Sequence, residues 1–131
     1  MSTTIYRIEH KETITKESNI TEINVGPYQT SFEGQTEMIN SHSKDSFYDI
    51  TSSHPSLITD IIVSNVRDYT EYYCGCNTRK SLTKWFYGFM GILKANDFVV
   101  VEYLVKDILM GQSGKQCFFR AEDIISKKVV N

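Results

Sequence analysis

Two cysteines one residue apart, Cys74 and Cys76, stand before three cations and the chain's one tryptophan in the stretch CGCNTRKSLTKWF. This combination suggests a metal site or a nucleic-acid contact. A structural zinc site needs four ligands, and its cysteine pairs usually have two or more residues between them. The remaining soft ligands are Cys117 and three scattered histidines. We therefore interpret the cysteines as small buried apolar residues and expect no metal or other cofactor.

The histidines, His10, His42 and His54, lie far apart, and none stands beside a cysteine or paired acids in a catalytic spacing. The sequence has no G-x-S-x-G, H-E-x-x-H or G-x-x-x-x-G-K-[ST] motif. The stretch GQSGKQ (residues 111–116) has the residues to hold a phosphate, although a hairpin loop explains it more simply. We expect a protein that is not an enzyme.

Composition sets further bounds. The 131 residues predict a single domain, residues 1–131, and 40% hydrophobic with 23% charged residues is typical of a globular chain. Fourteen Lys and Arg against sixteen Asp and Glu give a net charge of −2, which disfavours double-stranded DNA binding. No secretory leader and no long apolar run occur, so we expect a cytoplasmic protein with reduced thiols and no membrane association.

Local patterns predict the elements that position these residues. Thr4–His10 alternates in the strand period, and residues 71–76 are expected to form a short strand or a turn. Phe98–Val105 is β-branched and aromatic, which predicts a buried central strand. Lys115–Arg120 follows a glycine-containing turn, and we expect it to be the antiparallel partner of that strand. Residues 121–130 are expected to form a short helix or a frayed tail.

The best-supported helix spans Arg79–Lys94, with Thr78 as its N-cap. Five apolar residues recur at helical spacing and form its predicted core face: Leu82, Trp85, Phe86, Phe89 and Leu93. The opposite face carries Lys80, Lys84, Tyr87, Gly88 and Gly91. A glycine inside a helix costs about 1 kcal/mol relative to alanine. Two glycines on one face therefore suggest that a second protomer or a ligand approaches the helix closely there. The alternative is that the glycines are tolerated and have no special role.

A long polar stretch, Thr30–Ser53, is unusual inside a compact domain and indicates a functional or disordered loop, ordered only by a partner. Residues 54–69 favour a short helix. Together these elements predict an α+β fold: a small antiparallel sheet with one main amphipathic helix packed on it and a long polar loop.

Glu102 is a lone carboxylate on a largely apolar face of its strand, so it needs a partner. The candidates are Arg7 on the first strand and Arg120 on the last. Such an arrangement is either a structural ion pair or the lining of a pocket. In a pocket, arginine would recognise phosphate and aromatic rings would stack on a base.

Several blocks of the sequence occur in an order that resembles a group of small bacteriophage and prophage proteins. The blocks are YRIEHKE, GPYQT, HP, YYCGC…LTKWF, FVVVEYLV and GKQCFF, and they span residues 6–119. The chain departs from that pattern by a longer insert at residues 12–25. The resemblance implies an accessory factor that acts on host machinery in the cytoplasm of the infected bacterium.

One class to which the chain is similar in size and composition is the anti-defence sponges that oppose Thoeris systems. Those proteins sequester cyclic ADP-ribose-type signals by aromatic and arginine stacking on adenine, in pockets at oligomer interfaces. None of their binding residues aligns with this chain, so the similarity implies a function class and no site residues.

These observations favour a non-enzymatic counter-defence protein that binds and sequesters a nucleotide signal, as a homo-oligomer. Tyr28 follows the Gly-Pro turn, where an exposed ring can stack on a base. Arg79 and Lys84 would meet phosphates, and the indole N–H of Trp85 needs a partner if it is buried.

The alternative is a phage inhibitor that blocks a host defence complex by direct protein binding, in an anti-CRISPR-like or antirestriction role. In that case the polar loop Thr30–Ser53 and three tyrosines, Tyr69, Tyr72 and Tyr73, form the contact surface, because tyrosine is enriched in interfaces.

Overall fold

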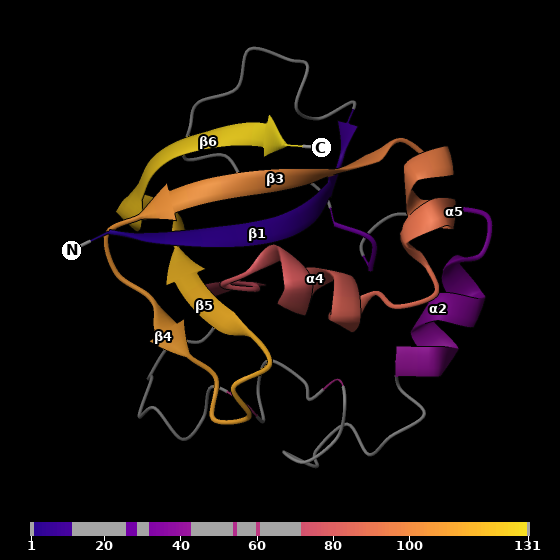
Figure 1. Cartoon of the computed structure of the whole chain (residues 1–131), viewed down its shortest axis with the longest axis horizontal. Coiled ribbons are helices and arrows are strands. Elements are labelled where there is room, and N and C mark those ends of the chain that lie inside the picture. Colours follow the sequence, from indigo (N-terminus) through magenta and orange to yellow (C-terminus); the bar gives the residue numbers. More distant parts are fainter. Residues whose placement is uncertain are drawn as a thin grey trace.

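The computed structural model describes residues 2–11, 26–28, 32–42, 54, 60 and 72–130. The helices are α2 (Gln35–His42), α4 (Arg79–Trp85) and α5 (Met90–Ala95), with a 3-10 turn at Ala121–Asp123. The strands are β1 (Thr3–His10), β2 (Tyr72–Gly75), β3 (Phe98–Val105), β4 (Leu109–Met110), β5 (Cys117–Arg120) and β6 (Ile124–Val130). They form two three-stranded antiparallel sheets, ordered β1-β3-β6 and β2-β5-β4 (Figure 1). The predicted α+β class is confirmed.

The first sheet is built on β3, whose β-branched and aromatic residues suit a central position. It pairs with β1 along its whole length, from Thr3 opposite Val105 to His10 opposite Phe98. Its other neighbour is β6, so the prediction of a helix or tail at residues 121–130 is wrong. Only the first three of those residues are helical, and the β-branched residues that follow gain ladder hydrogen bonds beside β3.

The strand predicted over Lys115–Arg120 exists as β5, but its predicted partner is wrong. It pairs with β2 and with β4, and so belongs to the second sheet. The turn between β4 and β5 is a hairpin loop, as expected for residues 111–116. The strand after the hairpin therefore does not return to β3; the next segment of the chain, β6, does so instead.

The CGC motif joins the two sheets. Tyr6 N–H donates to the Cys76 carbonyl at 2.7 Å, and Cys76 N–H donates to the Tyr6 carbonyl at 2.9 Å. A Cβ atom on Gly75 would lie 2.4 Å from Cγ2 of Ile5, so only glycine allows β2 to cross β1 this closely. The two glycine-flanking cysteines thus mark a crossing point between strands.

Hydrophobic side chains pack on both faces of the first sheet. One cluster lies between the sheets: Ile5, Val101, Tyr103, Val105, Cys117, Phe119 and Ile124. The other gathers residues from strand and helix: Ile8, Met38, Cys76, Leu82, Phe86, Leu93 and Phe98. The strand alternation of β1 divides its side chains between these two clusters.

The segment predicted as one helix over Arg79–Lys94 is two short helices. The Thr78 cap is confirmed, because its hydroxyl accepts a hydrogen bond from Ser81 N–H at 3.0 Å. The first helix ends at Trp85, and the chain turns at Gly88, whose φ of 87° lies in the left-handed region that disfavours other residues. The predicted core face still holds, with Leu82, Phe86 and Leu93 buried.

This break also explains one of the two helix glycines. Gly88 is required by the positive φ of the turn, and a Cβ atom at either Gly88 or Gly91 would meet nothing within 4 Å in the part of the chain that is described. The idea that both glycines mark a close approach is therefore not supported at Gly88. A homo-oligomer stays a prediction.

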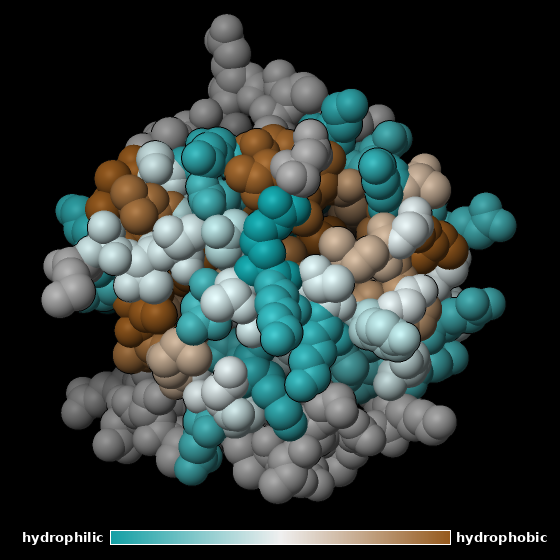
Figure 2. Space-filling model, viewed as in Figure 1, coloured by the Kyte–Doolittle hydropathy of each residue, from teal (hydrophilic) through white to brown (hydrophobic). Residues whose placement is uncertain are grey.

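The polar stretch Thr30–Ser53 contains a helix, α2, which anchors itself through the fully buried Met38. The rest of that stretch from residue 43, and the helix predicted over residues 54–69 apart from His54 and Asp60, lie outside the described residues. None of the described helices has the length and apolar character needed to cross a membrane. On the face shown in Figure 2, hydrophilic side chains form a band down the middle with hydrophobic groups on either side.

Candidate functional site

A cavity of about 220 Å³ lies where β1, β2 and the α4 region meet. Five aromatic rings contribute to its described lining: Tyr28, Tyr72, Tyr73, Trp85 and Phe86. The remaining lining residues are Arg7, Ile8, Gly26, Pro27, Cys74, Gly75, Cys76, Leu82 and Gln116. Arg7 is the one cation among them. The wall is thus mostly apolar, and its few polar groups lie among five aromatic rings.

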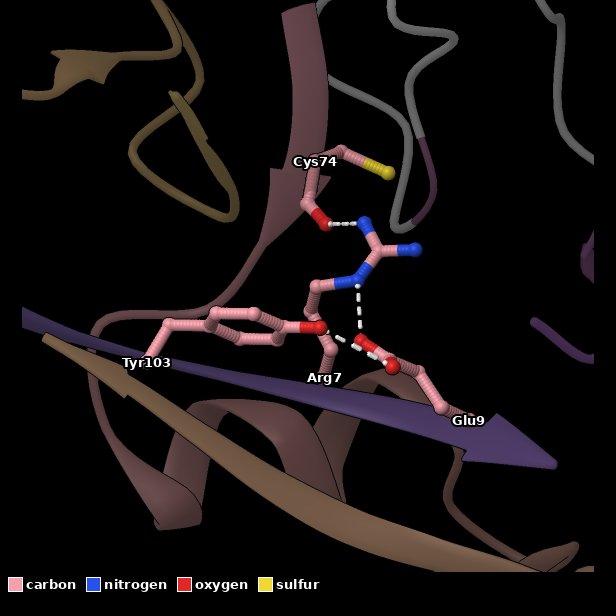
Figure 3. Close-up of polar contacts among 4 residues, drawn as sticks. All are labelled: Arg7, Glu9, Cys74 and Tyr103. Atoms are coloured by element: carbon pink, nitrogen blue, oxygen red, sulfur yellow. Dashed lines mark hydrogen bonds and ion pairs between the residues drawn. The ribbon is translucent and has the colours of Figure 1, made fainter. Parts of the chain in front are cut away.

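Arg7 is held in place by two partners (Figure 3). Its Nε donates to Oε2 of Glu9 at 3.0 Å, and its Nη1 donates to the carbonyl oxygen of Cys74. The guanidinium carbon also lies 5.9 Å from the centre of the Tyr73 ring, within the range of a cation–π contact. The side chain is only 10% exposed, so the position of the guanidinium group is fixed.

Glu9, the partner of Arg7, is completely buried and receives a second hydrogen bond from the hydroxyl of Tyr103 at 3.0 Å. Burial and the charge of Glu9 raise the pKa of Tyr103. Burial alone lowers the pKa of Arg7, but the negative charges of the Cys74 thiolate form and of Glu9 outweigh it and raise the pKa overall. Arg7 is therefore a cation at any physiological pH, with its charge balanced by Glu9.

Tyr28 and Trp85 form a second hydrogen-bonded part of the lining. Trp85 Nε1–H donates to the hydroxyl of Tyr28 at 2.9 Å, so the indole has the partner that it was predicted to need. The Tyr28 hydroxyl also contacts Nδ1 of His42. A hydroxyl can accept and donate at the same time, so it accepts from Trp85 and donates its own proton to Nδ1 when the imidazole carries its proton on Nε2. Although the residue is 43% exposed, its hydroxyl lies against Trp85 and His42, and this desolvation raises the pKa of Tyr28 and keeps its proton on the phenol.

His42 and His54, far apart in the sequence, stack behind Tyr28 with ring centres 3.9 Å apart and 13° between planes. His54 Nε2 donates to the backbone carbonyl of Trp85 at 2.6 Å. Burial, with a contribution from His54, lowers the pKa of His42 to about 4. His42 Nε2 is buried, and it has no hydrogen-bond partner in the part of the chain that the structure describes.

The three cysteines are free thiols. Burial raises the pKa of both Cys76 and Cys117 to about 12, so these two stay protonated and are poor metal ligands. The described residues contain no group of three or more side chains suited to hold a metal ion.

Of the predicted site residues, the cavity brings together three: Arg7, Tyr28 and Trp85. Tyr28 is 43% exposed, which agrees with the expected exposed ring after the Gly-Pro turn. Arg79 and Lys84 are exposed on α4 and do not line the cavity.

The predicted grouping of Glu102 with Arg7 and Arg120 is wrong. Glu102 accepts from the Tyr6 hydroxyl at 3.0 Å and pairs with Lys128 at 3.2 Å. Arg120 pairs instead with acids at the start of the following turn, Glu122 and Asp123. The reason is strand alternation, which places residues 7 and 102 on opposite faces of the sheet.

The loop at residues 111–116, considered above for a phosphate, binds a carboxylate of the chain itself. The buried Asp60 side chain accepts from Ser113 N–H at 2.7 Å and from the Ser113 hydroxyl at 2.8 Å. These donors are therefore already used within the fold.

Sequence reasoning missed two features of the site. The pairing of Arg7 with Glu9 was within reach, because residues two apart on a strand share a face. The stacking of His42 on His54 had no signal in the sequence, since it depends on how distant segments pack.

A protein-family model, described as the bacteriophage T4 Y00F protein, matches residues 1–130. The chain belongs to this family. Searches of curated proteins and of solved structures found no match. The family agrees with the bacteriophage resemblance of the sequence, and it identifies the chain as a phage protein.

Proposed function

We propose that this phage protein is a non-enzymatic counter-defence factor that binds and sequesters a nucleotide-type signal of its host. The observation that carries the proposal is the cavity itself, which is lined by five aromatic rings and one fixed arginine. Aromatic rings stack on a base of any identity, and arginine adds directional donors.

Its lining suits binding more than chemistry. The cavity lining, as far as it is described, includes no carboxylate and no histidine, the residues that most often act as general acid or base. Arg7 already has Glu9 and Cys74 as partners, and Cys76 stays protonated. Such fixed groups favour a rigid receptor that returns its ligand unchanged.

The test is a thermal-shift screen of the purified protein against cyclic nucleotides and ADP-ribose isomers. A ligand at about 100 times its dissociation constant adds about 2.7 kcal/mol to the free energy of unfolding. The bound compound is then recovered after heat denaturation and identified by mass spectrometry. Recovery of intact ligand supports sequestration, whereas recovery of a product identifies an enzyme and contradicts the proposal.

Two tyrosine variants locate the binding. Tyr28→Ala removes a ring that lines the cavity, and Tyr87→Ala removes a ring that is 83% exposed and lies outside the lining. We expect the first variant to lose the ligand-induced shift and the second to keep it. If no compound stabilises the protein and it co-purifies with a host complex instead, the direct inhibitor role replaces this proposal.

A further inference from the structure

We infer which part of a nucleotide enters the cavity: the oxo edge of a nucleobase, with the phosphates left in solvent. This inference rests on the proposed function and makes it more specific. It starts from Nη2 of Arg7, which has no hydrogen-bond partner among the described residues.

The guanidinium of Arg7 carries five N–H donors on three nitrogens, and two of these donors are used by described residues. Nε binds Glu9 and Nη1 binds the carbonyl of Cys74. No hydrogen bond to Nη2 occurs in the part of the chain that the structure describes, and Figure 3 shows Nη2 pointing away from both partners. Because Arg7 lines the cavity, we take this nitrogen to be the donor that meets a molecule entering it.

The geometry of these contacts limits what Arg7 can recognise. Carboxylates and phosphates are gripped by two parallel N–H groups on different nitrogens of the guanidinium fork. Nε is taken by Glu9, so the fork that includes Nε is closed to a ligand, whereas Nη2 keeps two N–H donors and Nη1 keeps one. A single acceptor atom needs only one of them. A ring carbonyl oxygen provides such an acceptor.

The charge balance leads to the same choice. Glu9 neutralises Arg7 at 3.0 Å and is itself completely buried. No second cation lines the cavity among the described residues. A phosphate placed there would be a buried charge without a counter-charge, which is costly. A neutral carbonyl gains the donor and adds no charge.

Size supports the same assignment. Cavities that enclose drug-sized ligands usually measure about 300–1,000 Å³. The cavity here, at about 220 Å³, is smaller and suits one planar ring system rather than a whole dinucleotide. Its aromatic walls, including Tyr73 and Trp85, then contact the ring faces, and the sugar and phosphates extend outward.

Inosine and adenosine provide a matched test, because they differ at ring position 6, where inosine has an oxo group and adenosine an amino group. An oxo group accepts from Nη2, whereas an amino group places a donor against a donor. We expect inosine to bind the wild-type protein at least about tenfold more tightly by calorimetric titration. Adding a 5′-phosphate to inosine should change the affinity by less than about threefold.

The outcomes separate this inference from the proposed function. Equal or tighter binding of adenosine, or a gain above about tenfold from the phosphate, overturns the oxo-edge assignment and leaves nucleotide binding intact. If neither nucleoside nor any nucleotide binds, both fail.

A variant adds a second readout. Arg7→Lys keeps a cation beside Glu9 but removes Nη2, so the preference for inosine should fall to less than about threefold. Circular dichroism checks that the variant is folded. If a folded variant keeps the full preference, Arg7 is not the group that reads the base.

Discussion

Two hydrogen-bonded triads lie on opposite faces of the β1–β3 strand pair. The inner triad consists of Arg7, Glu9 and Tyr103, and the outer triad consists of Tyr6, Glu102 and Lys128. Each has a carboxylate that accepts from a tyrosine hydroxyl at 3.0 Å and pairs with a cation at 3.0 Å or 3.2 Å. Their contact distances are almost the same.

Burial separates the two triads. In the inner triad Glu9 and Tyr103 are completely buried and the Arg7 side chain is 10% exposed. In the outer triad the side chains of Glu102 and Lys128 are 24% and 69% exposed. Water and salt screen the outer charges, whereas the inner charges are shielded from both. The comparison teaches that similar distances in one sheet can carry very different energies, and only the inner triad borders the cavity.

The largest effect is expected from breaking the inner ion pair. Arg7→Met leaves the Glu9 carboxylate buried without its counter-charge, which should lower the free energy of unfolding by about 3–5 kcal/mol. The matched outer variant, Lys128→Met, leaves a carboxylate that water can solvate, so its loss should be much smaller. Urea unfolding followed by circular dichroism measures both. Equal losses would show that burial does not separate the triads.

The tyrosines offer a milder comparison that removes one oxygen atom each. Tyr103→Phe takes a hydrogen bond from the buried Glu9 and should cost about 1–3 kcal/mol. Tyr6→Phe takes the equivalent bond from Glu102, where water can replace it, and should therefore cost less. The same urea titration measures both variants. A larger loss of stability for Tyr6→Phe would contradict the claim that the buried inner triad contributes more than the outer one.

The third prediction concerns the effect of burial on His42, whose ring contacts the Tyr28 ring of the cavity lining. The pKa of His42 is lowered from 6.5 to about 4 in the folded protein, mainly by burial. The unfolded chain therefore binds a proton that the folded chain does not, and stability should fall as pH decreases from about 6.5 to about 4. Melting temperature against pH measures this for the wild type and for His42→Phe. An unchanged slope in the variant would exclude His42 as its source.

The smallest effect is expected from salt. Raising the ionic strength to about 1 M shortens the screening length to about 3 Å, which weakens exposed ion pairs far more than buried ones. The difference in stability between wild type and Lys128→Met should shrink in high salt. The difference between wild type and Arg7→Met should not. Both differences are read from urea midpoints at two salt concentrations, and a shrinking Arg7 difference would show that water reaches the inner pair.

Much of the local structure followed from the sequence. The alternation of β1, the β-branched run of β3 and the Thr78 cap depend on neighbouring residues, so they were predicted correctly. Strand partners depend on distant segments, and for this reason β5 was assigned to the wrong sheet and β6 was not recognised as a strand. The helix break needed the positive φ of Gly88, which a periodic apolar pattern does not reveal.

The candidate site was predictable in part for the same reason. Residue types indicated Arg7, Tyr28 and Trp85, and packing brought these three to one cavity. The choice of partner for Glu102 failed because Arg7 lies on the other face of the sheet, where Glu9 is two residues away. Lys84 was predicted to bind a ligand but is exposed outside the cavity lining. The sequence could not show this, because it does not distinguish a ligand-binding lysine from a solvated one.

The most direct test of the cavity as the ligand site uses Trp85, the one tryptophan of the chain. Its indole N–H donates to Tyr28, and both residues line the cavity, so a single resonance in a ¹H–¹⁵N spectrum reports on the site. Titration with inosine should shift this resonance in a saturable way, with the dissociation constant found by calorimetry. A nucleoside that stabilises the protein but leaves the resonance unmoved would place the binding site elsewhere and contradict the account.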